Sequence, residues 1–225
     1  MLFSTAYLPP IAYVLEMMKS KELPIVELHE HYAKQSFRNR AQLLGANGVF
    51  SLSVPVLKKS NSKTLVKDIE IKYDENWQNN HWRSITSAYL SSPFFAYYMS
   101  DLEKFYTKKY KFLIDFNEDL LSYLIDKMNL ELKWTYSESF VPKSEITSMD
   151  LRDVLHPKKN YQELDSIKSY RQVFSDKFDF IPNLSALDLL CNEGQNAENY
   201  LKQCLSIQQT VSNKFIFPSS QIIKG

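Results

Sequence analysis

Two arginines separated by one residue, Arg38 and Arg40, are the clearest anion-binding feature of the sequence. The segment Phe37–Leu44 alternates like a strand, which would place both guanidinium groups on one face. Guanidinium groups bind phosphate and carboxylate oxygens well because each presents a planar fork of N–H donors. The two arginines therefore predict a site for an anionic ligand. The alternative is a structural role, with salt bridges to Glu27 and Glu30 on a neighbouring strand.

His81 is the histidine best placed for acid–base chemistry, because aromatic residues surround it in the sequence. It shares one stripe of a predicted helix with Trp77 and Ala88, and Trp82 follows it directly. An imidazole in such a place is shielded from water and could act as a general base, so His81 is our candidate catalytic residue. The alternative is a core histidine whose two ring nitrogens are both hydrogen-bonded.

Tyr7 ends the first predicted strand, and Pro9-Pro10 begins the helix that follows. Ligands of open α/β sheets gather at the carboxyl ends of strands and at helix N-termini, so Tyr7 is predicted to line a pocket. Three more side chains are candidates for the same ligand-binding surface: Asn39, Trp82 and Asn183. Asn183 precedes a Ser-x-x-Asp helix-capping pattern that begins at Ser185.

Glu27, His29 and His31 alternate along an extended segment, as a His-x-His metal site with a carboxylate would. A solvated strand end explains the three residues equally well, and no third histidine lies nearby in the sequence. We therefore predict no metal site and identify no cofactor.

The composition limits the classes of partner. The 27 lysines and arginines balance 26 acidic residues, so no overall field attracts nucleic acid or anionic lipid. Four glycines are too few for a glycine-rich phosphate loop. Cys191 and Cys204 have the apolar helical contexts of reduced core thiols. Since no basic leader precedes Pro9 and no apolar run approaches the ~18 residues of a membrane span, we predict a cytoplasmic protein.

The hydrophobic pattern predicts an α/β fold with a mixed sheet, as one domain over residues 1–225. A strand over Leu2–Leu8, a helix over Ile11–Lys19 and a strand over Pro24–Leu28 form an N-terminal β-α-β unit, with the two strands parallel. This opening is reminiscent of nucleotidyltransferase-like Rossmann architecture.

The sequence Asn47-Gly48 predicts a β-hairpin in which Phe37–Leu44 and Val49–Val56 pair antiparallel. A helical layer is predicted over residues 77–130, and a mobile loop over residues 141–161. The remaining predicted elements are strands at Asp68–Tyr73 and Leu132–Tyr136 and helices at Ser185–Asn192 and Ala197–Ser206.

Six motifs, in order and with matching spacing, carry a family resemblance: Tyr7-Leu8-Pro9-Pro10, residues 34–40 (KQSFRNR), Val54-Pro55-Val56, residues 81–85 (HWRSI), residues 88–95 (AYLSSPFF) and residues 180–190 (FIPNLSALDLL). Together they resemble the WbqC-like family over nearly the whole chain. The resemblance implies an association with bacterial surface polysaccharide synthesis, because many members are encoded in such gene clusters. Members commonly carry His-Gln-Pro where this chain has Phe3, Ser4 and Thr5, and a longer Leu-Ser-Gly segment near residues 137 to 165. A catalytic role of that family histidine therefore does not carry over.

The motifs lead to one functional hypothesis and a rival. We predict a transferase-like enzyme that acts on an activated, nucleotide-linked sugar or acyl donor in polysaccharide assembly, with Tyr7, Arg38, Arg40 and His81 converging on one cleft. The rival is a non-catalytic protein that binds a nucleotide-sugar or an assembly partner in the same pocket. A purely structural subunit is a third reading, and the sequence leaves the oligomeric state open.

Overall fold

Three short strands form a parallel sheet: β1 (Leu2–Ser4), β2 (Ile25–Glu27) and β5 (Thr135–Tyr136). The computed structural model describes residues 1–57, 64–146, 149–159, 161 and 166–214, and in it the strand order is β1-β2-β5. Helix α1 (Ile11–Lys19) connects β1 to β2, so the predicted parallel β-α-β unit is confirmed. Strand β1 is shorter than predicted because the Tyr7 N–H donates to the Phe37 carbonyl at 2.8 Å instead of continuing the ladder.

The chain around Asp150 adds a further parallel partner to β1. The Leu2 N–H donates to the Met149 carbonyl at 3.0 Å, and the Leu151 N–H donates to the Leu2 carbonyl at 2.8 Å. The carboxyl ends of this segment, β1, β2 and β5 therefore share one edge of the sheet. The segment belongs to the loop predicted over residues 141–161, of which residues 147, 148 and 160 lie outside the described part of the chain.

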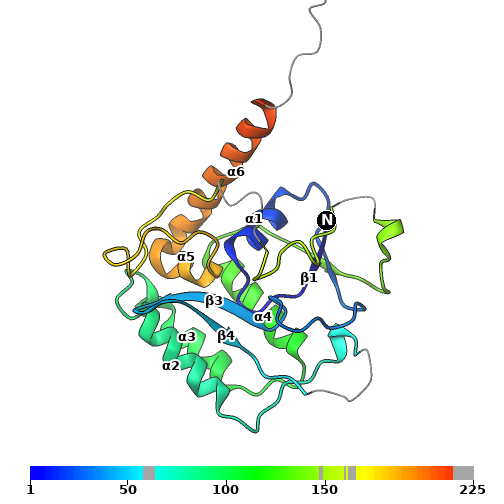
Figure 1. The fold of residues 1–225 in the computed structure, drawn as a ribbon, viewed down its shortest axis with the longest axis horizontal. Helices are drawn as coiled ribbons and strands as arrows, with labels where there is room; N and C mark the ends of the chain where they lie inside the picture. The colour runs from blue at the N-terminus through cyan, green and yellow to red at the C-terminus, as the bar shows by residue number, and fades with distance from the viewer. Residues whose placement is uncertain (58–63, 147–148, 160, 162–165, 215–225) are drawn as a thin grey trace, which may run out of the picture.

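The predicted hairpin is confirmed as β3 (Arg40–Gly45) and β4 (Gly48–Ser53), paired antiparallel with Gly45 opposite Gly48. The turn places its positive φ, +105°, on Gly48, in the region that glycine enters without steric cost. Figure 1 shows the hairpin between helices α2 and α3 on one side and α1, α4 and α5 on the other.

The start of the first hairpin strand was predicted wrongly, because residues 37–39 form a turn and β3 begins only at Arg40. Ser36 and Asn39 divert the backbone. The Ser36 hydroxyl donates to the Ala33 carbonyl at 2.8 Å, the Asn39 N–H donates to the Ser36 carbonyl at 3.4 Å, and the Asn39 amide donates to the Val54 carbonyl at 2.9 Å. Such local bonds compete with a ladder. Because Arg38 lies before the strand, strand alternation does not place its side chain on the same face as that of Arg40.

The helical layer is confirmed as α2 (Trp77–Tyr89), α3 (Phe95–Thr107) and α4 (Leu113–Lys127). The strand predicted at Asp68–Tyr73 is wrong, since this segment starts with the end of the 3₁₀ helix η1 (Val66–Asp68) and continues with isolated bridges at Glu70 and Ile71. Their partners, Phe112 and Val56, belong to different parts of the chain, so no continuous ladder forms.

The C-terminal part contains α5 (Ala186–Glu193), the 3₁₀ helix η4 (Gly194–Asn196) and α6 (Ala197–Lys214), and a further 3₁₀ helix, η2 (Lys143–Glu145), lies earlier in the chain. The predicted cap of α5 is present, because the Ser185 hydroxyl accepts a hydrogen bond from the Leu187 N–H at 3.2 Å. Gly194 ends the helix with φ +57°, and a Cβ there would lie 2.8 Å from the Phe94 ring.

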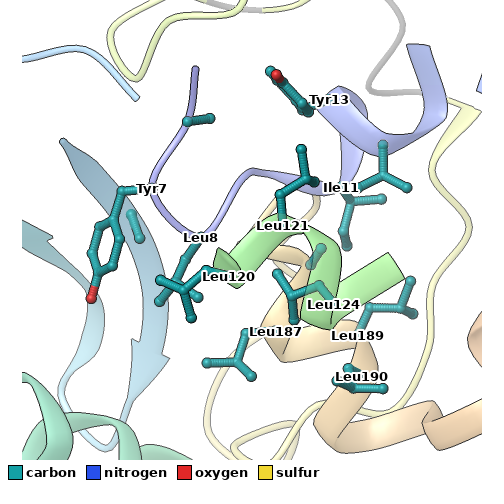
Figure 2. Close-up of a cluster of buried hydrophobic side chains, with 14 of the residues drawn as sticks. Tyr7, Leu8, Ile11, Tyr13, Leu120, Leu121, Leu124, Leu187, Leu189 and Leu190 are labelled. Atoms are coloured by element: carbon teal, nitrogen blue, oxygen red, sulfur yellow. The ribbon is translucent and has the colours of Figure 1, made fainter. Parts of the chain in front are cut away.

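The core joins α1, α4 and α5, and Figure 2 shows Leu8, Leu120 and Leu187 converging within it. The preceding side chain, Tyr7, points the other way, toward the hairpin. Leu8 has φ +41°, a conformation that costs a non-glycine residue about 1–3 kcal/mol and persists only where packing enforces it. Burial of Leu8 in the core therefore fixes the direction of Tyr7.

Both cysteines are buried and free of disulfides. Within the described residues, no helix combines the length and the apolar character that crossing a bilayer requires.

Candidate functional site

Three side chains from separate elements form a buried hydrogen-bonded chain, which we call the tyrosine–histidine chain: Tyr106, Tyr7 and His81. The Tyr7 hydroxyl lies 2.9 Å from Nδ1 of His81 and 2.9 Å from the Tyr106 hydroxyl. Tyr7 follows β1, His81 belongs to α2 and Tyr106 to α3. The structure thus brings two of the predicted site residues, Tyr7 and His81, into direct contact.

His81 is neutral at physiological pH. Burial lowers the pKa of its imidazole to about 4, and a backbone hydrogen bond with Ser53 opposes this shift. A backbone bond raises the pKa of a histidine when the ring donates and the carbonyl accepts, so the proton is assigned to the nitrogen facing Ser53. The other nitrogen, Nδ1, then accepts from Tyr7, because a neutral imidazole has one donor and one acceptor. Tyr106 in turn donates to Tyr7.

Aromatic rings enclose this chain on most sides. Trp77 meets the His81 ring edge-on at 5.0 Å between centroids, and Phe116 stacks on Tyr7 at 5.5 Å. Trp82, a predicted ligand-binding residue, is half-buried and stacks on Tyr106 at 5.9 Å. Trp82 is therefore the part of the enclosure that reaches toward solvent.

Arg38 does not join this chain, because a carboxylate already holds it. Its Nε and Nη2 donate to the two oxygens of Glu30 at 2.9 and 2.6 Å, and both side chains are buried. A fork-to-fork pair of this kind occupies the donors that would grip a phosphate. The contacts of Arg38 thus match the structural alternative considered for it. Of the two glutamates named in that alternative, Glu30 is its partner.

A second buried arginine, Arg152, lies next to this pair. Its Nη1 is 3.4 Å from Glu27 Oε2, its Nη2 donates to Asp150 at 2.9 Å, and its carbonyl lies 3.5 Å from Arg38 Nη2. Pairing with Arg152 lowers the pKa of Asp150. Five residues form this group at the carboxyl edge of the sheet, the sheet-edge ion network: Glu27, Glu30, Arg38, Asp150 and Arg152.

The network also includes Glu27, which was considered above together with His29 and His31. Glu27 accepts hydrogen bonds from the His29 N–H at 2.8 Å and from the Ser137 hydroxyl at 2.6 Å, in addition to Arg152. The Glu27 carboxylate thus accepts hydrogen bonds from residues that follow β2 and β5. Among the described residues, no group of three His, Cys, Asp or Glu side chains is arranged to hold a metal ion.

Arg40 differs from Arg38 in having no carboxylate partner among the described residues. It is half-buried, and its Nε is buried without a hydrogen-bond partner. Arg40 lies opposite Ser53 in the β3–β4 ladder, and Ser53 is the backbone partner of His81. Opposed Cα atoms in such a ladder lie about 4.5–5.5 Å apart. The backbone of Arg40 is therefore paired directly with the residue whose backbone binds His81. The neighbouring side chain, Asn39, also has a buried Oδ1 without a hydrogen-bond partner.

Asn183 performs a structural task at the first helix. Its Oδ1 accepts from the Ala12 N–H at 2.8 Å, and the Leu184 carbonyl accepts from the Ile11 N–H at 3.0 Å. Asn183 has φ +60°, a conformation that asparagine tolerates better than most residues. The first amides of α1 are thus satisfied within the protein, and this helix N-terminus is closed to a ligand.

Cavities of about 940, 630 and 280 Å³ lie on the described part of the chain, and Tyr7, Arg38, Arg40 and His81 line none of these three. The first, about 940 Å³, lies at the amino edge of the sheet near Pro24, and a Glu198–Lys202 ion pair partly neutralises its charged wall. The second, about 630 Å³, is lined by Leu28 and Tyr136, at the carboxyl ends of β2 and β5. Size alone favours the first cavity, but the carboxyl edge is where open sheets bind ligands.

Sequence reasoning missed Tyr106 and Arg152 as members of these groups. Tyr106 follows Tyr98 and Leu102 at intervals of four, so helical periodicity could have marked it as buried, although not as a partner of Tyr7. Arg152 lies in a segment without periodicity, and no pattern in the sequence pairs it with Glu27.

Comparison with known proteins identifies a family and a relative that this chain resembles. The WbqC-like protein family matches residues 5–156. A relative from Mycobacterium tuberculosis (strain ATCC 25618 / H37Rv), "Uncharacterized protein Rv1507c", is 26% identical over 199 residues, which cover 77% of this chain and 84% of the relative. No solved structure matches. Since the family match spans well over half of the chain, this protein belongs to the WbqC-like protein family.

Proposed function

We propose that this protein is a transferase-like enzyme that acts on an activated, anionic sugar or acyl donor, such as a nucleotide-linked sugar, in bacterial surface polysaccharide biosynthesis. Family membership supports the biological setting. The observation that carries the chemistry is the position of Arg40, a guanidinium without a carboxylate partner among the described residues, next to the strand residue that binds neutral His81.

In this proposal Arg40 binds the anionic leaving group of the donor, and the tyrosine–histidine chain takes up the proton of the attacking acceptor. The acceptor hydroxyl transfers its proton to Tyr106, the Tyr106 proton moves to Tyr7, and the Tyr7 proton moves to Nδ1 of His81. The new bond joins the acceptor oxygen to the transferred group, while the donor's phosphate departs with the bonding electron pair. An anion bound at Arg40 favours the imidazolium, which offsets the low pKa of His81.

The rival function, a non-catalytic binding protein for the same donor, is favoured by one observation. His81 and Tyr106 are 6% and 5% exposed, so an acceptor has little access to either side chain. A binding protein would need only Arg40 and its surroundings.

A thermal-shift screen of nucleotides, nucleotide-sugars and acyl carriers tests the proposal. A ligand at a hundredfold excess over its Kd stabilises the fold by about 2.7 kcal/mol, which should raise Tm by roughly 5–10 °C at this chain length. The Arg40→Ala variant should lose this shift, whereas the control Arg83→Ala, which alters an exposed arginine of α2, should keep it.

The outcomes separate the candidates. Stabilisation with release of the nucleotide in the presence of acceptor supports the transferase, and stabilisation without turnover supports the binding protein. If no anionic compound shifts Tm, or if Arg40→Ala retains the full shift, the proposed site is wrong.

A further inference from the structure

A cavity of about 630 Å³ lies at the carboxyl ends of β2 and β5. Its volume falls within the range of small-molecule sites, about 300–1,000 Å³. Leu28, which follows β2, and Tyr136, in β5, form one wall. Three lysines and three carboxylates also line the cavity: Lys108, Lys109, Lys111, Asp115, Glu118 and Asp119. The cavity thus combines the preferred place on the sheet with aromatic and charged groups.

Glu118 is a partly spare hydrogen-bond acceptor on this wall. A single oxygen, Oε2, accepts from both the Trp134 indole at 2.9 Å and the Tyr136 hydroxyl at 2.6 Å. Its other oxygen, Oε1, has no hydrogen-bond partner among the described residues. Burial raises the pKa of Glu118, and the bonds from Tyr136 and Trp134 oppose that shift. The carboxyl group is therefore held in a fixed orientation with one acceptor free for the hydroxyl groups of a ligand.

Lys109 and Lys111 supply positive charge beside the Lys108–Asp119 pair, in a cavity that Asp115 also lines. Lys108 pairs with Asp119 at 3.3 Å, but Lys109 and Lys111 have no ion-pair partner among the described residues. Each instead lies over an aromatic ring, Lys109 over Tyr73 at 5.5 Å and Lys111 over Phe112 at 4.9 Å. Their ammonium groups stay available for an anion.

We propose that this cavity binds a sugar phosphate. Lys109 and Lys111 bind the phosphate, the sugar hydroxyls donate to Oε1 of Glu118, and the exposed ring of Tyr136 packs on the apolar face of the sugar. The inference rests on the cavity alone and requires neither Arg40 nor His81. The two sites are neighbours, because the Tyr110 ring of the cavity contacts Phe116 at 5.1 Å and Phe116 stacks on Tyr7.

Calorimetric titration of the full chain tests this site with three probes: glucose 1-phosphate, glucose and inorganic phosphate. Glucose 1-phosphate should bind at least tenfold more tightly than either of the others. The double variant Lys109→Ala/Lys111→Ala should weaken glucose 1-phosphate at least tenfold, and Glu118→Gln should weaken it several-fold while leaving inorganic phosphate unchanged.

Two controls make the result specific. Lys104→Ala, which removes an exposed lysine of α3 that does not line the cavity, should leave binding unchanged, and melting of the ligand-free variants checks that each one folds. Equal affinities for phosphate and glucose 1-phosphate, insensitive to Glu118→Gln, would overturn the proposal by reducing the site to a charged patch. Loss of binding in Arg40→Ala but not in the lysine variant would also overturn it, yet leave the transferase proposal standing.

Discussion

The tyrosine–histidine chain and the sheet-edge ion network bury polar groups in opposite ways. In the chain, His81 gives up its charge, and each hydroxyl or ring nitrogen finds a neutral partner. In the network, Arg38 and Arg152 keep their charges and lie against Glu30, Glu27 and Asp150. Burying a charge is tolerable only when it is paired, whereas a neutral group needs only its hydrogen bonds. The network should therefore be fragile to mutation, and the chain fragile to acid.

The largest effect is expected from Arg38→Ala. Removing the guanidinium leaves the buried Glu30 carboxylate without its bidentate partner, which should lower the free energy of unfolding by about 3–5 kcal/mol. Urea denaturation at pH 7 measures this loss. Arg83→Ala on the surface should change stability by less than about 0.5 kcal/mol.

The double variant Arg38→Met/Glu30→Met sharpens this test, because it removes both charges and fills the space with apolar atoms. Its stability should return most of the way to wild type. A cost of Arg38→Ala below 1 kcal/mol would contradict the assignment of Arg38 as a structural residue and return it to the ligand-binding candidates.

Acid should act mainly through His81. Its folded pKa of about 4 lies below the ordinary value of 6.5, so between these values the unfolded state binds more protons. The free energy of unfolding should thus fall as pH drops from about 6.5 to about 4, by up to about 3 kcal/mol from this group. His81→Gln, which cannot titrate, should lack that component. Parallel stability curves for the two proteins over this range would show that His81 is not buried neutral.

Asp188 offers a third case, a buried carboxyl group with hydrogen bonds but no cation partner among the described residues. Burial raises its pKa from 3.8 to about 6, although the Tyr170 hydroxyl donates to it at 2.5 Å and lowers the pKa. The folded state therefore binds more protons between these values, and stability from this group is lost as pH rises from about 3.8 to about 6. The change should be slightly smaller than for His81 and of opposite sign. Measuring Asp188→Asn against wild type at pH 4 and pH 7 isolates it, and a constant difference would contradict the buried, raised-pKa carboxyl.

The fold was largely predictable because local patterns determine its elements. Asn47-Gly48 strongly favours a tight hairpin turn, and the apolar periodicity over residues 77–130 is that of helices. The main errors, at residues 37–39 and Asp68–Tyr73, fall where side-chain bonds to the backbone or scattered tertiary partners replace the ladder. These competitors lie close in energy to a strand, and their choice depends on contacts with distant residues.

The candidate site was predictable residue by residue but not as an arrangement. Tyr7 and His81 were identified from motif and aromatic context, and they touch. Arg38 was identified from its anion-binding chemistry, yet the partner of a guanidinium depends on where Glu30 lies in three dimensions. The backbone turn at Leu8, which orients Tyr7, likewise depends on packing in the core and cannot be predicted from the neighbouring residues in the sequence.

The smallest effect expected is that of Tyr106→Phe, and it tests the direction of hydrogen bonding in the chain. If Tyr106 donates to Tyr7 and Tyr7 donates to His81, removing the Tyr106 hydroxyl costs one hydrogen bond and leaves Nδ1 of His81 satisfied. The loss should be about 1 kcal/mol. Tyr7→Phe should cost more, because it leaves both Nδ1 of His81 and the Tyr106 hydroxyl unpaired.

The surface control for this pair is Tyr97→Phe, at a residue that is 77% exposed and should show no measurable change. Nitrogen-15 chemical shifts of the His81 ring give the second measurement, since the proton should stay on the nitrogen facing Ser53 in Tyr106→Phe. If the shifts of the unchanged protein place the proton on Nδ1, His81 donates to Tyr7 and the chain runs the other way. The proposed proton route toward His81 would then have no acceptor at its end.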